Sequence, residues 1–515
     1  MRRIIERVLL AAIVFAMTGF VLLVLIGLWD RYEKQAAASG FNEADGRYLA
    51  PQAVSPRGSD THSDAMTELS PHVAVARDRL GSAQVVRQEP KQASTHAFDG
   101  TNQGMSVALS ADGSTAIMGG PGPHNADVGR SPFVGPAGAA WAFTRSHGIW
   151  TQQGNKLVGT TSEYGGGLWS QGASVALSAD GNTAIVGGPS DNKTKGAAWV
   201  FTRTGGVWTQ QGNKLVGSDA YRVGESQLPW GQGMSVALSA DGSTAIVGGW
   251  GAEAAWVFTR KASGVWTQEG KLVGDGAVGR SHRGMSVALS ADGNTAIVGG
   301  WSDNSRAGAA WMFSRSRGVW AQQGKKLVGA GAVGSANQGW SVALSADGNT
   351  AIVGGPGDNM WNPSVPFGLG AAGAAWIFTR NGSSWTQEGE KLVSTKSARQ
   401  GTSVALSADG NIAIVGGLME DGGGGGLVFI RDGGQWRLDK KLVGTSAVGK
   451  STPSVALSAD GSVIMIGGPN DNGGIGAVWV FAHSGGGWSE DKKLIGTDAV
   501  GKSRPSVAVS ADDSR

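Results

Sequence analysis

Cysteine is absent from this chain of 515 residues, which excludes a disulfide framework, thiolate metal sites and cysteine nucleophiles. An excess of charge of one sign is also lacking, because the formal net charge is only +3. No stripe of Lys and Arg alternates with aromatic residues, so nucleic acid is a poor candidate partner. The phosphate-binding loops and nucleophile elbows that link a strand to a helix are missing as well.

Histidine is scarce, and none of the seven histidines is paired at a metal-ligand spacing such as His-x-x-x-His. His124 with Asp127 is the best of several weak candidates for chemistry, although an exposed loop histidine is the simpler interpretation. We therefore expect no metal, no cofactor, no catalytic residue and no enzymatic activity.

The chain does contain an internal repeat. The unit Ser-Val-Ala-Leu-Ser-Ala-Asp-Gly recurs unchanged, starting at Ser106, Ser174, Ser235, Ser286, Ser341, Ser403 and Ser454. The interval between starts ranges from 51 residues (Ser235 to Ser286) to 68 residues (Ser106 to Ser174). A fixed core with loops of variable length indicates an array of structural repeats.

Each repeat is expected to form four short antiparallel strands. In the fourth repeat, residues 285–291 and 295–300 flank the hairpin signal Asp292-Gly293, and residues 309–315 and 320–329 flank a second turn. Seven such units predict an all-β, seven-bladed β-propeller over residues 101–505, with repeats beginning near residues 104, 172, 233, 284, 339, 401 and 452. Residues 506–515 are expected to form a closing strand or to begin an eighth repeat.

The motif Gly-x-Ser-Val-Ala-Leu-Ser-Ala-Asp-Gly, followed by Gly-Ala-Ala-Trp-(Val/Ile)-Phe, occurs for example in residues 172–201 and 339–378. It resembles the FG-GAP repeats of integrin α-subunit propellers and their bacterial relatives. The resemblance covers residues 101–515 and implies a propeller that binds or adheres. Calcium-binding members of that family carry an Asp-x-Asp-x-Asp-Gly loop in the first hairpin. Here the loop has one carboxylate. Ca²⁺ prefers about six to eight oxygen ligands, so this loop cannot supply them.

Residues 8–29 form an uncharged apolar stretch that would span about 33 Å as a helix, enough to cross a bilayer. Arg2, Arg3 and Arg7 precede it, so the positive-inside rule places residues 1–7 in the cytoplasm. We expect a retained single-pass signal anchor in the cell membrane, with the propeller periplasmic or extracellular. A cleaved signal peptide ending near residues 36–38 is the alternative. Residues 30–100 are expected to be a flexible linker.

Variation in loop length is confined to one face of the predicted propeller. The tight turns lie at one end of the strands, called the turn face here. The connections between second and third strands and those between blades lie at the other end, called the elaborated face. Variable loops on a rigid scaffold are the usual place for binding residues. Six tryptophans outside the repeated framework fall in or beside these connections: Trp169, Trp230, Trp250, Trp301, Trp340 and Trp361.

These six tryptophans are candidate ligand-binding residues, because loop aromatics can stack on sugar rings or anchor a protein. Local packing between loops is the alternative interpretation. Asp-Asn pairs after the second strand, as at Asp303, are interpreted as local turn motifs rather than cation ligands. The sequence therefore predicts a membrane-anchored binding or adhesion module for an unidentified protein or polysaccharide. A structural scaffold of an envelope assembly and an exported propeller enzyme are the alternatives.

Overall fold

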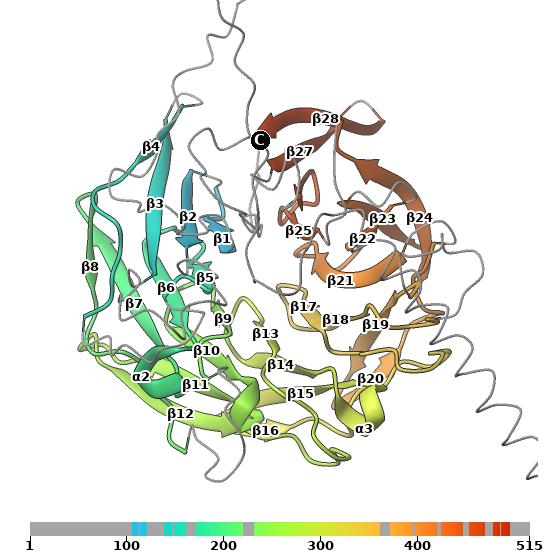
Figure 1. Cartoon of the computed structure of the whole chain (residues 1–515), viewed down its shortest axis with the longest axis horizontal. Helices are drawn as coiled ribbons and strands as arrows, with labels where there is room; N and C mark the ends of the chain where they lie inside the picture. The colour runs from blue at the N-terminus through green and yellow to red at the C-terminus, as the bar shows by residue number, and fades with distance from the viewer. Residues whose placement is uncertain are drawn as a thin grey trace, which may run out of the picture. The chain divides into compact units, whose positions relative to one another are not determined.

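The computed structural model describes residues 106–112, 114–120, 138–146, 149–160, 171–219, 231–360, 371–394, 398–419, 424–445, 453–468, 477–484 and 486–494. These residues form seven four-stranded antiparallel sheets, and in each sheet the strands follow one another in chain order. Each sheet packs against the next one along the chain, so the sheets are arranged round a ring (Figure 1). The chain is a seven-bladed β-propeller, as the repeats predicted.

The first strand of each blade lies nearest the centre of the ring (Figure 1) and is made mostly of small residues. Its serine links neighbouring blades: Ser174 Oγ donates a hydrogen bond of 2.9 Å to the carbonyl oxygen of Gly233 in the next repeat. Ser106 and Ser341 make the equivalent bond. The first strands are β1 (Ser106–Leu109), β5 (Ser174–Leu177), β9 (Ser235–Leu238), β13 (Ser286–Leu289), β17 (Ser341–Leu344), β21 (Ala398–Leu406) and β25 (Ser454–Leu457).

The second strand is buried on both faces in the blades where its burial is described throughout, because sheets stack against both of its sides. Its first glycine allows a close backbone approach: a Cβ on Gly187 would lie 2.2 Å from the carbonyl oxygen of Gly233. The second strands are β2 (Thr115–Gly120), β6 (Thr183–Gly188), β10 (Thr244–Gly249), β14 (Thr295–Gly300), β18 (Thr350–Gly355), β22 (Ile412–Leu418) and β26 (Val463–Gly468).

In six of the seven blades the third strand carries a framework tryptophan, which belongs to the core as predicted; Leu427 takes this place in the sixth blade. Trp376 is fully buried, and its Nε1–H donates to the carbonyl oxygen of Ala330 in the preceding repeat at 2.9 Å. Trp199, Trp256, Trp311 and Trp479 make the equivalent bond. The third strands are β3 (Ala139–Ser146), β7 (Ala197–Thr204), β11 (Ala254–Arg260), β15 (Ala309–Ser316), β19 (Ala374–Asn381), β23 (Gly424–Asp432) and β27 (Ala477–Ser484).

The fourth strand is partly exposed, and in four blades it is interrupted. After β16, for example, Gly324 takes a positive φ of 65°, and Leu327 then pairs again with Ala310 of the third strand. The fourth strands are β4 (Ile149–Gln152), β8 (Val207–Gln210), β12 (Trp266–Leu272), β16 (Val319–Gln322), β20 (Ser384–Gln387), β24 (Gln435–Val443) and β28 (Gly487–Leu494).

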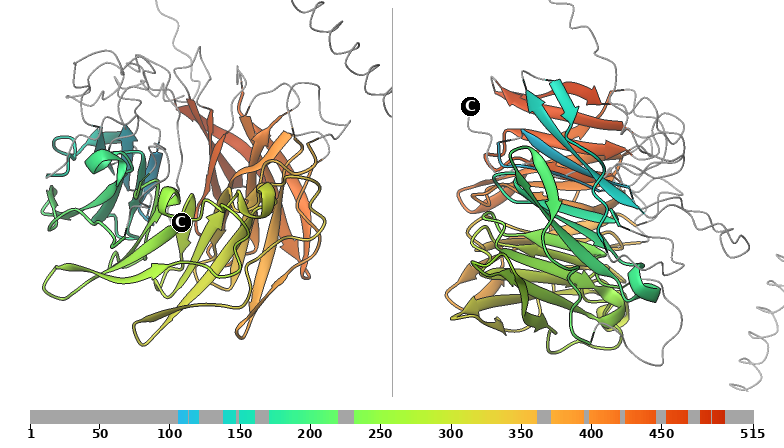
Figure 2. Two further views of the ribbon diagram at one scale, coloured as in Figure 1. Left: turned by 60° about the horizontal axis from the view of Figure 1, so that its bottom comes forward. Right: turned by 90° about the vertical axis from the view of Figure 1, so that its left-hand side faces the viewer.

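The hydrophobic core lies between neighbouring sheets, which pack face to face (Figure 2). One cluster joins Ile297 and Met312 of the fourth blade to Val353, Trp376 and Phe378 of the fifth, and all five side chains are buried. Because each blade buries its faces against its neighbours, the stability of a blade depends on the blades beside it.

The repeated Ser-Ala-Asp-Gly turns are joined to one another by backbone hydrogen bonds along the turn face. In six successive junctions the alanine N–H of one turn donates to the alanine carbonyl oxygen of the next, along the series Ala111, Ala179, Ala240, Ala291, Ala346, Ala408 and Ala459. The turn sequence is therefore constant because it connects blades.

The turn aspartates hold the turns closed rather than binding a ligand. Asp180 Oδ1 accepts hydrogen bonds from Ser178 Oγ at 2.5 Å and from the Asn182 N–H at 2.9 Å. Partial burial raises the pKa of Asp180, but the hydrogen bonds from Ser178 and Asn182 outweigh it, and the pKa is lowered from its ordinary value. The carboxylate is therefore ionised at neutral pH and fully used within its own turn.

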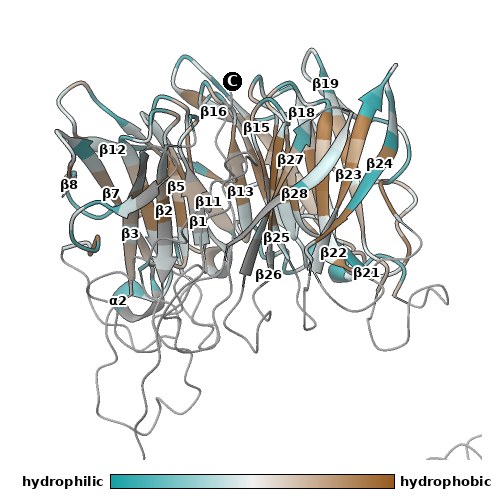
Figure 3. Ribbon diagram, turned by 90° about the horizontal axis from the view of Figure 1, so that it is seen from above, coloured by the Kyte–Doolittle hydropathy of each residue, from teal (hydrophilic) through white to brown (hydrophobic). Residues whose placement is uncertain are grey.

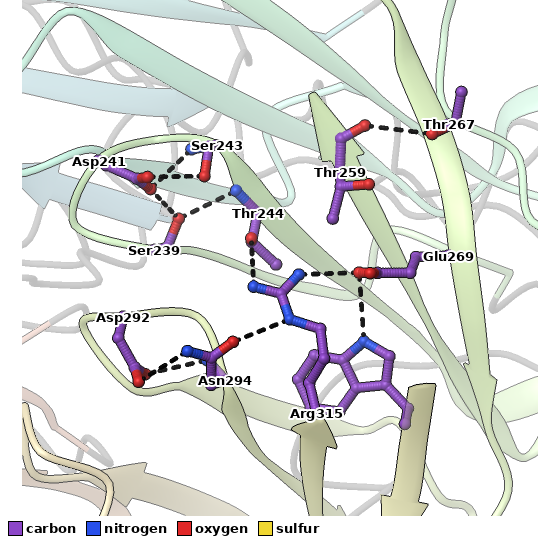
Figure 4. Close-up of polar contacts among 11 residues, drawn as sticks. Ser239, Asp241, Ser243, Thr244, Thr259, Thr267, Glu269, Asp292, Asn294 and Arg315 are labelled. Atoms are coloured by element: carbon purple, nitrogen blue, oxygen red, sulfur yellow. Dashed lines mark hydrogen bonds and ion pairs between the residues drawn. The ribbon is translucent and has the colours of Figure 1, made fainter. Parts of the chain in front are cut away.

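A second set of polar contacts joins neighbouring blades near the turn face (Figure 4). Arg315 of β15 donates to Asn294 Oδ1 at 2.9 Å and to Glu269 Oε2 of the preceding blade at 2.8 Å. Arg203 and Arg431 make the equivalent contacts with Gln153 and Glu388 of the blades before theirs.

The expected membrane anchor cannot be placed in this structure. None of the described helices is both long and apolar enough to cross a membrane. Residues 8–29, the linker 30–100 and residues 506–515 all lie outside the described residues.

We predict that Gly329→Ala destabilises the propeller by about 1–3 kcal/mol, because this is the usual cost of overpacking a core. A Cβ on Gly329 would lie 2.1 Å from Trp376 Cδ1. Chemical denaturation of the full chain measures the effect. Gly487→Ala is the control, because a Cβ there meets no atom within 4 Å. Equal stability of the two variants would show that the Gly329–Trp376 contact is not required.

Candidate ligand-binding face

The irregular elements lie in the connections that follow the second strands. They are α2 (Asp191–Thr194), η2 (Trp250–Ala252) and α3 (Asp303–Arg306). Figure 3 shows α2 at the edge of the sheets opposite to the tight turns. Among the described residues, the irregular connections therefore lie on the elaborated face, as predicted from the loop lengths.

Three of the six candidate tryptophans lie together on this face. Trp250 opens η2, Trp301 follows β14 and Trp340 precedes β17. They belong to the third, fourth and fifth repeats, and all three are half-buried. Trp169, Trp230 and Trp361 lie outside the described residues.

His282 links these tryptophans into one aromatic row. Its ring lies 4.8 Å from the ring of Trp250 in an edge-on arrangement, and 5.1 Å from Trp301 in a stacked arrangement with an interplanar angle of 29°. Trp301 in turn lies 5.5 Å from Trp340, again edge-on. We call Trp250, His282, Trp301 and Trp340 the aromatic row; it crosses three blades.

No sequence signal pointed to His282, because the residue has neither a metal-ligand spacing nor a repeated position. Both of its ring nitrogens are buried and have no hydrogen-bond partner among the described residues. Burial lowers the pKa of His282, the charge of Arg280 lowers it further, and Glu253 only partly opposes them. The imidazole is therefore neutral at neutral pH and behaves as an aromatic ring with an unused donor and acceptor.

The junction of the third and fourth blades departs from the pattern of four other junctions. At those four, a buried glutamine precedes the glycine that enters the next blade, and its side-chain oxygen accepts a backbone N–H: Gln171, Gln232, Gln338 and Gln400. Arg283 takes this place in the fourth repeat. The residue opposite, which is a glycine in the second, fourth and fifth repeats, is Glu253.

Glu253 and Arg283 form a buried polar network. Glu253 Oε2 lies 3.2 Å from Arg283 Nη2 and accepts a hydrogen bond of 2.8 Å from Ser281 Oγ. Arg283 also donates to the carbonyl oxygen of Gly274. The network fixes the backbone on both sides of His282, because Ser281 and Arg283 are its chain neighbours.

Five non-glycine residues at the same junction have a left-handed backbone with positive φ. Asn304, Ser305 and Arg306 have successive φ values of 47°, 56° and 72°, and His282 and Glu253 have 54° and 52°. Non-glycine residues adopt this left-handed region at an energetic cost, and such residues cluster at functional sites.

An open cleft of about 460 Å³ lies beside the aromatic row. It is lined by Val278, Gly279, Arg280, Ser302, Ser305 and Arg306. The Arg306 guanidinium lies 5.9 Å from the centre of the Trp301 ring, which joins the cleft to the row. A cleft of this volume is the size that small ligands occupy.

A larger groove of about 630 Å³ lies between the outer strands of the second and third blades. Its lining includes the repeated residues Gln211, Leu215, Phe258 and Trp266, whose equivalents recur in other blades. This groove is a general feature of the gap between blades and singles out no ligand.

The Asp-Asn pairs are not the local turn motifs that the sequence indicated. Asp303 is buried; its Oδ2 lies 2.5 Å from Lys326 Nζ, and its Oδ1 accepts a hydrogen bond from the Val278 N–H at 2.8 Å. Asp358 makes the equivalent ion pair with Lys391. Each of these aspartates therefore joins three segments: its own loop on the elaborated face, the outer edge of its blade, and the connection that enters the blade. Within the described ranges, no group of three His, Asp or Glu side chains could hold a metal ion.

The sequence matches no known family model and no curated protein. Solved structures of similar architecture include a putative 6-phosphogluconolactonase from Bacteroides uniformis, 11% identical with a TM-score of 0.46, covering 71% of this chain and 94% of that one. The periplasmic gluconolactonase PpgL of Pseudomonas aeruginosa is 15% identical with a TM-score of 0.42, covering 72% and 93%. Sqt1 of Saccharomyces cerevisiae is 13% identical with a TM-score of 0.46, covering 78% and 87%. At these identities the likeness concerns the fold alone.

The expectation that this chain is not an enzyme is corrected here. It rested on missing catalytic motifs and on a resemblance to binding propellers, yet two of the similar structures carry the names of lactonases. Residues contributed singly by several blades leave no linear motif, so their absence from the sequence does not exclude catalysis.

We predict that Arg283→Gln lowers the free energy of unfolding by about 3–5 kcal/mol, because it removes the buried cation paired with the Glu253 carboxylate and leaves only the more exposed Arg280 at 3.9 Å. The double variant Glu253→Gly with Arg283→Gln recreates the pair found at other junctions, and we expect it to regain stability to within about 1 kcal/mol of the original chain. Urea denaturation measures both. A double variant no more stable than Arg283→Gln alone would show that the two residues are not coupled.

Proposed function

We propose that this chain is a glycan-binding propeller whose ligand lies on the elaborated face, at the junction of the third and fourth blades. The observation that supports the proposal is the aromatic row, in which four half-buried rings from three blades contact one another beside an open cleft. Sugar rings combine apolar faces with polar edges, and aromatic rings bordered by polar loops match both.

The size and lining of the cleft favour a glycan over a protein partner. A stable protein interface buries about 800 Å² on each side and has an apolar centre. The cleft is instead small, and four of its six lining residues are arginine or serine. A protein partner and a purely structural role in an envelope assembly are alternative outcomes of the experiment below.

The FG-GAP relationship stays an interpretation of the repeat motif.

We further propose that residues 8–29 hold the propeller outside the cytoplasmic membrane, as the sequence predicted. In cells that produce the full chain, we expect it to remain in the membrane after alkaline washing. Protease added to spheroplasts should digest the repeats. Release by alkaline washing would contradict a membrane anchor.

We predict that replacing Trp250, Trp301 and Trp340 by alanine abolishes glycan binding, because the stacking surface is lost. The full chain, kept in mild detergent because of its apolar segment, is titrated calorimetrically with soluble polysaccharides. The matched control replaces three exposed valines near the turn face, Val207, Val265 and Val319, by alanine and should bind like the original chain.

Thermal unfolding of the same variants separates binding from packing. A triple tryptophan variant that melts close to the original chain and no longer binds supports the proposal. A large loss of melting temperature would identify the rings as packing between loops. Failure of the original chain to bind any glycan, together with capture of one defined envelope protein, would favour the protein-binding alternative.

A further inference from the structure

The cleft beside the aromatic row carries an excess of positive charge. Arg280 and Arg306 line it from two different connections, and none of its six lining residues is acidic. Arg280 is 38% exposed on its side chain, and Arg306 is exposed. Both guanidinium groups are therefore accessible from solvent.

The two nearby carboxylates are already engaged by other groups. Glu253 accepts hydrogen bonds from Ser281 and Arg283 and lies 3.9 Å from Arg280 Nε. Asp303 is buried against Lys326. Two carboxylates thus face four cations at this junction, since Arg280 and Arg306 add to Arg283 and Lys326. An anion that entered the cleft would meet a positive field.

Arg306 is held in place before any ligand arrives. Its carbonyl oxygen accepts a hydrogen bond from the Asn337 N–H at 2.9 Å, and its N–H donates to the Ser302 carbonyl oxygen at 3.2 Å. Its backbone is left-handed, at the end of the run that begins at Asn304. A side chain on a backbone fixed in this way loses less freedom on binding than one on a mobile loop.

We propose that the glycan is acidic, and that Arg280 and Arg306 bind the carboxylate or sulfate groups of sugars that stack on the aromatic row. This inference rests on the proposed function and specifies its ligand class. Guanidinium groups suit both anions, because their N–H donors match the spacing of oxyanion oxygens. The Ser302 and Ser305 side chains in the same cleft supply donors and acceptors for sugar hydroxyl groups.

The test uses two pairs of polysaccharides, each pair having the same sugar backbone with and without its anionic groups. Polygalacturonate is compared with its fully methyl-esterified form, which tests carboxylates, and dextran sulfate is compared with dextran, which tests sulfate esters. We expect the full chain to bind at least one acidic member about 10-fold or more tightly than its neutral counterpart. The preference should shrink as NaCl is raised from about 50 to 300 mM.

The variant Arg280→Gln with Arg306→Gln should lose this preference and keep the weaker binding of the neutral polymer. The control is Arg317→Gln with Lys325→Gln, two exposed residues away from the cleft whose replacement removes the same net charge. It should keep the preference. An equal loss in both variants would show general attraction of a basic chain and would overturn the inference.

The outcomes also separate this inference from the proposed function. Equal binding of acidic and neutral polymers that still requires the aromatic row would overturn the acidic ligand and leave the glycan-binding proposal standing. No binding of any of the four polymers by the original chain would overturn the acidic-glycan inference directly. If the wider polysaccharide panel also fails, the glycan-binding proposal fails with it.

Discussion

At five of the six junctions between successive blades, a third-strand tryptophan packs against a glycine that follows the outer strand of the preceding blade; Ser394 and Leu427 occupy these places between the fifth and sixth blades. The pairs are Gly159 with Trp199, Gly217 with Trp256, Gly274 with Trp311, Gly329 with Trp376 and Gly444 with Trp479. The indole N–H bonds to the carbonyl oxygen of the residue after the glycine, so the ring is buried without losing a hydrogen bond. At these five junctions the contact sets how closely the two blades approach each other, and the blades are also joined by the backbone hydrogen bonds of their turns.

The two faces of the propeller differ because the turns of the turn face are hydrogen-bonded from blade to blade. On the turn face, the Ser-Ala-Asp-Gly turns share a series of backbone hydrogen bonds, and each aspartate is occupied within its own turn. A substitution there would disturb two blades at once. The connections of the elaborated face are not joined by such a continuous series of hydrogen bonds, so they can differ in length and carry binding residues.

The third and fourth blades meet at a junction that departs from the glutamine pattern of four other junctions. Glu253 replaces a glycine and Arg283 replaces a glutamine, and the two changes compensate each other through one buried ion pair. Unusual backbone, a histidine with unused nitrogens, the aromatic row and the cleft all lie at this same junction. A repeat array keeps its regular geometry where only stability matters, so a compensated departure from it favours a function at that place.

The sequence by itself determined the blades, their number and the face with the variable connections, because alternation, turn residues and loop lengths can all be counted along the chain. It also marked six tryptophans outside the repeated framework as candidates, among them Trp250, Trp301 and Trp340. Only the tertiary structure brought the residues of the proposed site together. His282, Arg280 and Arg306 carry no motif, and they meet because two connections distant in sequence leave adjacent blades at the same edge. The aspartates such as Asp303 were misinterpreted for the same physical reason: the partners of Asp303, Lys326 and Val278, lie in other segments, 23 and 25 residues away in sequence.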